Sequence, residues 1–261
     1  MDTYATKIRE YMLSPVHTIL DSQPLGDALI RLDTFGISGL GAVDRAGSLV
    51  GVISRTDLLR AGRVRLLNGK RRKVLSVPNA TVQGYMTPTV EIIAPDRPMS
   101  EAAQHMLRRH VHRLYVSEDR KPAGVVSTKE MMRAVVDQRA ERPISAFMHA
   151  GVVTVQAHEP VSHAVDRITA TERSGVVVAE DGWPVGIFTQ ADALAARDAV
   201  PEDRVDEWMD PRIICLPMEI PLYRAAEQAV ATRARRVLAV DAKSIRGIVT
   251  GLDFTRVVAQ G

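Results

Sequence analysis

Short apolar runs alternate with amphipathic stretches along the chain, in an order that occurs four times. Each copy holds a short apolar run, a stretch with apolar residues spaced near 3.6, two more apolar runs separated by a polar turn, and a last amphipathic stretch. Short β-branched runs favour strands, and the 3.6-residue spacing favours helices. The sequence therefore predicts four β-α-β-β-α units of about 50 residues each, of the α+β (mixed α/β) class.

A heptapeptide marks the turn from the third strand to the last helix of each unit. It consists of a glycine, a short apolar run, a hydroxyl residue, two variable positions and a carboxylate. Backbone N–H groups at a helix start are unpaired and point outward, so such a turn favours the binding of phosphate. The four copies are GVISRTD at 51–57, GVVSTKE at 124–130, GIFTQAD at 186–192 and GIVTGLD at 247–253.

Two further landmarks keep a constant distance from each heptapeptide. A proline precedes each motif glycine by 26 or 27 residues, and an aromatic–Met pair ends 12 residues before that proline. Three landmarks held in phase identify a true internal repeat. The prolines are Pro24, Pro98, Pro160 and Pro221, and the methionines are Met12, Met86, Met148 and Met209. We interpret the aromatic–Met pairs as core contacts.

The spacing of the landmarks sets the expected domain boundaries. The first interval between motif glycines is longer than the others, because it contains a basic segment. Asn68–Gly69 lies between two β-prone arms there, which is the pattern of a tight hairpin. The predicted domains are repeat 1 at 8–62, a basic β-hairpin insertion at 63–80, repeat 2 at 82–139, repeat 3 at 143–199 and repeat 4 at 204–260.

Positive charge is concentrated in the insertion. The chain has 34 Lys and Arg against 31 Asp and Glu, but seven of the basic residues lie between Arg60 and Lys73, where no carboxylate occurs. The basicity is therefore local and does not indicate a general nucleic-acid-binding surface. For the hairpin arms at 63–77 two interpretations stay open: a solvated or self-associating arm, and an arm that binds nucleotide phosphates, nucleic acid or an acidic protein.

Composition and motif content exclude several classes of protein. A single cysteine, Cys215, rules out an intrachain disulfide framework and a thiolate metal cage. No apolar run is long enough to cross a membrane, and the charged start MDTYATKIRE is unlike a secretory signal, so we expect a cytoplasmic protein. His110 and His112 are poor evidence for a metal, and none is expected. We find no catalytic triad and no P-loop, and do not expect an enzyme.

The four-copy pattern resembles the cystathionine β-synthase (CBS) domain family. The family's adenosine-ligand motif is a glycine, an apolar residue, any residue, Ser or Thr, any two residues and Asp, which three of the heptapeptides match. The resemblance implies two Bateman modules, each a pair of repeats, in a plan similar to the gamma subunit of AMP-activated protein kinase. It also implies a non-catalytic sensor that binds AMP, ADP or ATP in clefts between paired repeats and signals to a separate protein partner. A homodimer is one of the assemblies this plan allows.

The resemblance also assigns roles to residues. In the family the motif Asp accepts hydrogen bonds from both ribose hydroxyls, the motif Ser or Thr binds phosphate, and the first strand holds adenine. The matching ribose-binding residues are Asp57, Asp192 and Asp253, the phosphate-binding residues are Ser54, Thr189 and Thr250, and the adenine-binding residues are Thr18, Ile19, Thr154, Val155, Cys215 and Leu216. Glu130 replaces the Asp in repeat 2, and its extra methylene predicts a weak or empty site.

Cations occur before the second strand only in the even repeats. Repeat 2 has His112 and Arg113 there, and repeat 4 has Arg235 and Arg236, whereas repeats 1 and 3 have Ser–Gly. In the kinase gamma subunit a His–Arg pair at this place reaches the phosphates, so by resemblance we assign these four residues to phosphate, some of them reaching across from the paired repeat.

Two alternatives need no nucleotide. Ser or Thr followed three residues later by Asp or Glu is a helix capping box, and for Glu130 this interpretation is favoured. For the whole protein, the alternative function is a nucleic-acid or acidic-protein binding module that acts through the basic hairpin.

Overall fold

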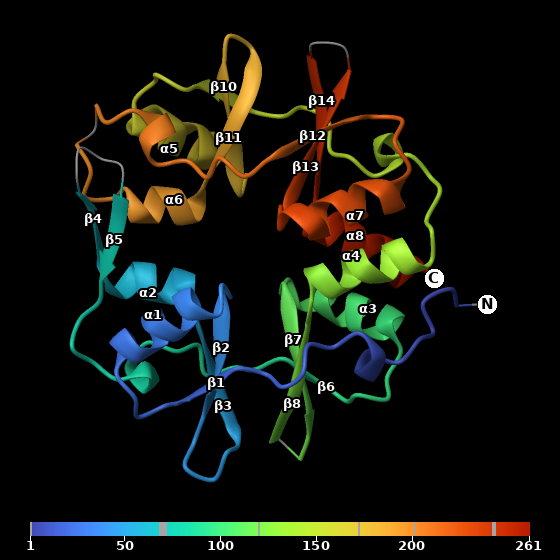
Figure 1. Ribbon diagram of the computed structural model, residues 1–261. Helices are drawn as coiled ribbons and strands as arrows, with labels where there is room; N and C mark the ends of the chain where they lie inside the picture. The colour runs from blue at the N-terminus through green and yellow to red at the C-terminus, as the bar shows by residue number, and fades with distance from the viewer. Residues whose placement is uncertain (1, 68–71, 120, 172, 201, 242–243) are drawn as a thin grey trace. The chain divides into compact units, whose positions relative to one another are not determined.

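The computed structural model describes residues 2–67, 72–119, 121–171, 173–200, 202–241 and 244–261. By packing, the chain divides into two compact units, whose elements are labelled in Figure 1. Unit 1 comprises Met1–Ala61, Val77–Ala140 and Gly251–Gly261, and unit 2 comprises Gly62–Ser76 and Glu141–Thr250.

The described residues contain the four predicted β-α-β-β-α repeats. Repeat 1 is formed by β1 (Thr18–Leu20), α1 (Leu25–Thr34), β2 (Gly39–Val43), β3 (Leu49–Ser54) and α2 (Arg55–Ala61). Repeat 2 is formed by β6 (Ile92–Ile93), α3 (Met99–Arg109), β7 (Arg113–Glu118), β8 (Lys121–Ser127) and α4 (Thr128–Asp137). Repeat 3 is formed by β9 (Thr154–Gln156), α5 (Val161–Thr171), β10 (Gly175–Glu180), β11 (Trp183–Thr189) and α6 (Gln190–Ala195). Repeat 4 is formed by β12 (Ile214–Pro217), α7 (Leu222–Thr232), β13 (Arg236–Asp241), β14 (Ser244–Thr250) and α8 (Gly251–Gln260). The predicted fold class is confirmed.

Each repeat has one three-stranded sheet with the second strand in the middle. The first strand pairs parallel to the second, as in Thr154 opposite Val177, and the third pairs antiparallel, as in Thr189 opposite Gly175. A parallel pair needs a crossover connection, and the first helix of the repeat provides it. Pro24, Pro98 and Pro221 are the N-cap residues of α1, α3 and α7, where the missing N–H is harmless.

Apolar residues at helical spacing join each helix to its sheet. In α5 the positions Val161, Ala164 and Ile168 are buried, and they form one cluster with Val176 and Val178 of the central strand. Burying a side chain such as Val or Ile contributes roughly 1.5–3 kcal/mol, so this cluster stabilises repeat 3.

The segments before the first strands are exchanged between the two repeats of a unit. Each contains a 3-10 helix that lies on the other repeat: Ile8–Glu10, Val82–Gly84, Ile144–Ala146 and Val205–Glu207. The amide of Val82 donates to the carbonyl of Gln23 at 2.9 Å, and the amide of Val205 donates to the carbonyl of Glu159 at 2.9 Å. This exchange joins repeats 1 and 2 into one module, and repeats 3 and 4 into the other.

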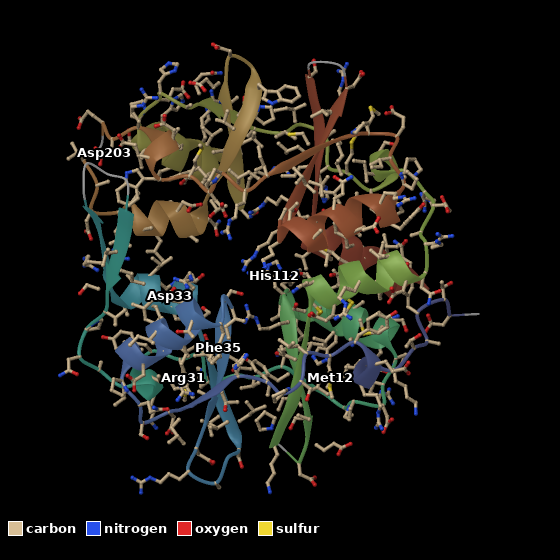
Figure 2. The ribbon with its side chains drawn as sticks, viewed as in Figure 1. Met12, Arg31, Asp33, Phe35, His112 and Asp203 are labelled. Carbon is tan, nitrogen blue, oxygen red and sulfur yellow. The ribbon has the colours of Figure 1, made fainter. Side chains whose placement is uncertain are left out.

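The methionine of each aromatic–Met pair lies against the motif glycine of the paired repeat. A Cβ on Gly51 would lie 2.5 Å from Sδ of Met86, and a Cβ on Gly124 would lie 2.6 Å from Sδ of Met12, which Figure 2 labels. At such distances a side chain would force the methionine to shift, which favours glycine at the first motif position. The same contacts join Met148 to Gly247 and Met209 to Gly186.

Within each module, residues of the two sheets pack together. In unit 1, Tyr115 of β7 forms a buried cluster with Val43 and Leu49 of repeat 1. In unit 2, Leu238 of β13 clusters with Val177 and Ile187 of repeat 3. Burial raises the pKa of Tyr115 to about 12, so its hydroxyl stays protonated at neutral pH.

The two units are discontinuous in sequence, because two segments belong to a different unit from the repeat that precedes them or contains them. Helix α8, the last element of repeat 4, packs against α3 and α4 in unit 1. The hairpin strands β4 (Arg63–Leu67) and β5 (Arg72–Ser76) pair antiparallel and belong to unit 2, although they follow repeat 1 in the sequence. The predicted Asn68–Gly69 turn lies outside the described residues.

The hairpin is anchored on repeat 3 at its base. Val64 packs against the core cluster of repeat 3, and Arg63 Nε lies 3.0 Å from Asp198 Oδ2. The guanidinium of Arg197 donates to the carbonyl of Gly62. One basic residue of the segment is therefore used in an ion pair that holds the hairpin to this unit.

Candidate functional site

The motif of repeat 1 forms the turn between β3 and α2. Asp57 Oδ2 accepts hydrogen bonds from Ser54 N at 2.9 Å and from Ser54 Oγ at 2.6 Å. In return, the Asp57 amide donates to Ser54 Oγ at 3.2 Å. The other carboxylate oxygen lies 3.3 Å from Arg60, and 12% of the Asp57 side chain is exposed. This is a capping arrangement in which one face of the carboxylate still reaches the surface.

Repeat 3 has the same turn between β11 and α6. Asp192 Oδ2 accepts from Thr189 N at 2.9 Å and from Thr189 Oγ1 at 2.7 Å, and together the two residues complete a capping box. Asp192 is partly exposed. The helix cap that the sequence offers as an alternative is thus present in both repeats. Its hydrogen bonds fix each carboxylate at the end of its strand.

The carboxylates of the even repeats are less accessible. Glu130 is 6% exposed and completes a capping box with Ser127 at the start of α4. Asp253 is 2% exposed, and its carboxylate pairs with Arg256 one turn further along α8. Burial therefore separates the four motifs into two partly exposed ones, in repeats 1 and 3, and two buried ones, in repeats 2 and 4.

The predicted adenine-binding residues alternate along their strands. Ile19, Val155 and Leu216 are buried, and Val155 belongs to the core cluster of its own repeat. Their neighbours Thr18, Thr154 and Cys215 lie on the opposite faces and are at least partly exposed. Because successive side chains of a strand point to opposite faces, only one side chain of each predicted pair is available to a ligand. Burial also raises the pKa of the Cys215 thiol, which makes it a weak nucleophile.

In unit 1 a guanidinium from repeat 2 crosses to repeat 1. Arg113 Nη2 donates to Ser38 Oγ at 2.7 Å, just before β2. A Cβ on Gly39 would lie 3.1 Å from Arg113 Cζ, and Gly39 pairs with Ser54 across β2 and β3. The glycine thus provides the space for the guanidinium beside the motif of repeat 1. Figure 2 labels the exposed His112, the residue before Arg113.

In unit 2 the corresponding guanidinium is Arg236, at the start of β13. Burial lowers the pKa of Arg236, while the charges of Asp192 and Asp210 oppose this shift. A desolvated guanidinium needs anionic neighbours. Arg236 of repeat 4 therefore interacts electrostatically with Asp192, the motif carboxylate of repeat 3. In both units, a guanidinium of the even repeat thus acts on the odd repeat.

Two residues that the sequence analysis does not name complete this cluster. Arg212 donates from Nε to Asp210 Oδ1 and from Nη2 to Asp210 Oδ2, both at 2.9 Å, and its backbone amide donates to Oδ1 at 3.0 Å. Although burial raises the pKa of Asp210, the hydrogen bonds from Arg212 and the charges of Arg212 and Arg235 hold it below its ordinary value. The hydrogen bond to Asp210 and the charge of Asp192 raise the pKa of Arg212.

The place of Asp210 in the fold explains why sequence reasoning missed it. It follows Met209 directly, in the exchanged segment of repeat 4, and pairs with Ile187 of β11 through two backbone hydrogen bonds of 2.9 Å. Thr87 follows Met86 and pairs with Val52 in the same way in unit 1. The signal in the sequence is therefore the position after the aromatic–Met pair, which becomes informative only once the exchange is known.

The remaining predicted residues are distributed as follows. Arg235 is exposed, and its charge contributes to the lowered pKa of Asp210. Thr250 is partly exposed at the end of β14. In the basic hairpin, the structure does not describe the side chains of Arg65 and residues 70–73. Nucleic-acid binding through the hairpin therefore stays a prediction. Among the described residues, no group of three or more His, Cys, Asp or Glu is arranged to hold a metal ion, and no helix is long and apolar enough to span a membrane.

A model of the CBS domain family matches three segments of the chain, residues 8–63, 82–137 and 144–199. The fourth repeat lies outside these segments but has the same order of strands and helices. The match covers well over half of the chain.

Curated relatives align with about half of the chain. The chain is 26% identical over 129 residues to the A-adding tRNA nucleotidyltransferase of Aquifex aeolicus, covering 49% of this chain and 14% of that protein. It is 27% identical over 128 residues to the inosine-5'-monophosphate dehydrogenase of Methanocaldococcus jannaschii, covering 49% of this chain and 23% of that protein. The chain thus spans less than a quarter of the length of either relative.

A solved structure matches nearly the whole chain. This is a Methanocaldococcus jannaschii protein described as a candidate archaeal homologue of g-AMPK, with a TM-score of 0.76 and 18% identity over 97% of this chain and 99% of that chain. The likeness shows a shared four-repeat fold.

Proposed function

The chain belongs to the CBS domain family, and from this membership we propose that it is a non-catalytic regulatory protein that binds AMP, ADP or ATP between paired repeats. In this proposal, nucleotide binding changes how the chain acts on a separate protein partner. The tRNA nucleotidyltransferase and dehydrogenase relatives carry their activities in proteins that this chain covers only in small part, so no activity is transferred from them.

One observation carries the proposal: each partly exposed motif carboxylate has a guanidinium of the paired repeat near its strand end. Arg236 is coupled to Asp192 in unit 2, and Arg113 lies against Gly39, the strand partner of Ser54, in unit 1. A carboxylate can accept hydrogen bonds from two vicinal hydroxyls at once, and a guanidinium binds phosphate through paired N–H groups. Ribose and phosphate are the two parts of a nucleotide that need these groups.

The same criterion ranks the four motifs. We propose that the sites of repeats 1 and 3 bind nucleotide, with Asp57 and Asp192 as ribose ligands, and Arg113, His112, Arg236 and Arg235 near the phosphates. The motifs of repeats 2 and 4 are weaker candidates, because Glu130 and Asp253 are almost fully buried. In addition, the paired repeats 1 and 3 have Ser–Gly before the second strand, so they supply no cation there to the motifs of repeats 2 and 4.

A ligand held by two repeats has a direct route to signalling. If it binds one arrangement of the paired repeats about tenfold more tightly than another, it shifts their equilibrium by roughly 1.4 kcal/mol, within the usual range of allosteric coupling. No catalytic group is required for such a shift.

Isothermal titration calorimetry with AMP, ADP, ATP and S-adenosylmethionine tests the proposal. We expect at least one adenine nucleotide to bind, and Asp192→Ala to weaken its site tenfold or more, since a charge-assisted hydrogen bond contributes roughly 1.5–3 kcal/mol. Asp57→Ala should act in the same way on the other site. The matched control is Asp166→Ala, because Asp166 is an exposed carboxylate on α5, away from the motif.

The absence of heat with every nucleotide would contradict the proposal. So would unchanged binding in the Asp57→Ala/Asp192→Ala double variant, because the carboxylates would then not be the ligands.

A further inference from the structure

The phosphate end of the repeat 3 site differs from that of repeat 1 by one carboxylate. Asp210 and Thr87 hold equivalent positions, each bridged to the residue after a motif glycine, Ile187 and Val52 respectively. Repeat 3 therefore has an anionic side chain where repeat 1 has a neutral hydroxyl. The difference is local, since the backbone hydrogen bonds at the two positions are the same.

Asp210 lies among guanidinium groups in unit 2. Its two oxygens accept the paired hydrogen bonds from Arg212, and Arg235 and Arg236 both interact with its charge. The parallel pairing of β12 with β13 begins with Ile214 opposite Val237, which brings the residues before Ile214 to the strand end where Arg236 lies. The carboxylate thus occupies a place where three cations converge.

We propose that Asp210 is a built-in anion that competes with the ligand's phosphate for these arginines and so sets the affinity of the repeat 3 site. This inference rests on the proposed function, because it concerns the phosphate end of the same site. Asp210 restrains binding of phosphorylated ligands and leaves the nucleoside end untouched. The repeat 1 site, with Thr87 at the same position, has no such restraint.

The chemistry of the cluster explains the direction of the effect. Two carboxylates, Asp192 and Asp210, face three guanidiniums, so the cluster has one net positive charge before ligand binds. A phosphate at these arginines competes with Asp210 for Arg212 and lies near the Asp210 carboxylate. Removing that charge leaves the arginines available and takes away the repulsion.

Asp210→Asn tests the inference while conserving shape and the hydrogen bond from the Arg212 amide. The measurement is made with Asp57→Ala/Arg113→Gln as the background, so that the repeat 1 site is disabled. We expect AMP and ADP to bind on the order of tenfold more tightly, from the loss of one like charge a few ångströms away. Adenosine should bind as before. The reciprocal variant, Thr87→Asp in an Asp192→Ala/Arg236→Gln background, should weaken AMP by a similar factor.

The outcomes separate the inference from the proposed function. If nucleotide binds but Asp210→Asn leaves its affinity unchanged or weakens it, the inference is wrong and the proposed function stands. If the Asp210→Asn protein also loses adenosine, Asp210 is a ribose ligand and the inference is wrong. If no nucleotide binds to the wild type, the proposed function fails. Inorganic pyrophosphate then decides the inference: tighter binding to Asp210→Asn supports it, and equal or no binding in both proteins overturns it.

Discussion

At the scale of single residues, the repeats are fitted together by pairs of one small and one large side chain. The motif glycines admit a methionine of the paired repeat, and Gly39 admits the guanidinium of Arg113. Because glycine has no Cβ, another segment can approach the backbone at these positions. The same residue type thus allows packing of methionine at the motif and the approach of Arg113 to repeat 1.

Gly51→Ala should destabilise unit 1, because its Cβ would lie 2.5 Å from Met86 Sδ and 3.0 Å from the Thr87 carbonyl. We expect a loss of about 1–3 kcal/mol, typical of overpacking, in urea denaturation. Gly26→Ala is the matched control, since nothing lies within 4 Å of its Cβ in α1. That change should be neutral or slightly stabilising. Equal effects of the two changes would contradict the packing role of Met86.

Glu91 gives unit 1 a defined response to acid. Burial raises its pKa, but hydrogen bonds from Arg109 at 2.8 Å and from His105, whose Nε2 lies 2.8 Å away, hold it below its ordinary value. A carboxyl with a depressed folded-state pKa contributes stability above its unfolded pKa, and this contribution is lost as pH falls through the folded value.

Glu91→Gln should therefore lower the free energy of unfolding at pH 7 by about 1 kcal/mol. The difference from the wild type should shrink below about pH 4, where the wild-type carboxyl becomes protonated. Thermal unfolding from pH 3 to 7 measures both effects. Glu101→Gln, which removes a more exposed carboxylate of α3 paired with Arg97, is the control and should change little. A pH-independent loss in Glu91→Gln would refute the linkage.

At the scale of elements, the motif turns of repeats 1, 2 and 3 each carry a side-chain cap that exists without ligand. In α4 and α6 the hydroxyl and the carboxylate complete a capping box, and Ser54 and Asp57 make the same side-chain bonds before α2. The cap satisfies amides that would otherwise be unpaired and also fixes the carboxylate. The structural and ligand-binding interpretations of the motif are therefore compatible.

Ser127→Ala and Thr189→Ala should separate these two roles. Each removes a capping hydroxyl and should cost about 1 kcal/mol of stability, measured by chemical denaturation. Only Thr189→Ala should also weaken nucleotide binding, because the buried Glu130 in the Ser127 turn is a poor ligand. Loss of nucleotide affinity in Ser127→Ala at a matched stability would show that the repeat 2 motif binds as well.

At the scale of the whole molecule, the packing units cut across the order of the repeats. Helix α8 belongs to unit 1 and the hairpin β4–β5 belongs to unit 2, so the chain crosses the unit boundary four times. Helix α8 is buried through α3 and α4, and the hairpin is held through Val64 and Arg63. Cooperative unfolding is expected to follow packing, so the discontinuous units should be the ones that exchange amide hydrogens together.

Val64→Ala should loosen unit 2, because Val64 packs against the core cluster of repeat 3. A loss of about 1 kcal/mol corresponds to roughly fivefold faster hydrogen exchange in α5 and β10, measured by mass spectrometry. Val74→Ala in the same hairpin is the matched control, since Val74 is 36% exposed. Faster exchange of the repeat 1 elements alone in Val64→Ala would contradict the assignment of the hairpin to unit 2.

The sequence by itself determined the repeats and what each contains. Strand and helix periodicity depends on local backbone geometry, and four copies in phase made the order of the elements and the position of Asp57 and Asp192 readable. The exchange of the leading segments, the burial of Asp253 and Glu130, and the cluster of Asp210 with three arginines were decided only by the tertiary structure. These features depend on contacts between residues far apart in the chain, such as Asp210 with Ile187, and no local pattern specifies them.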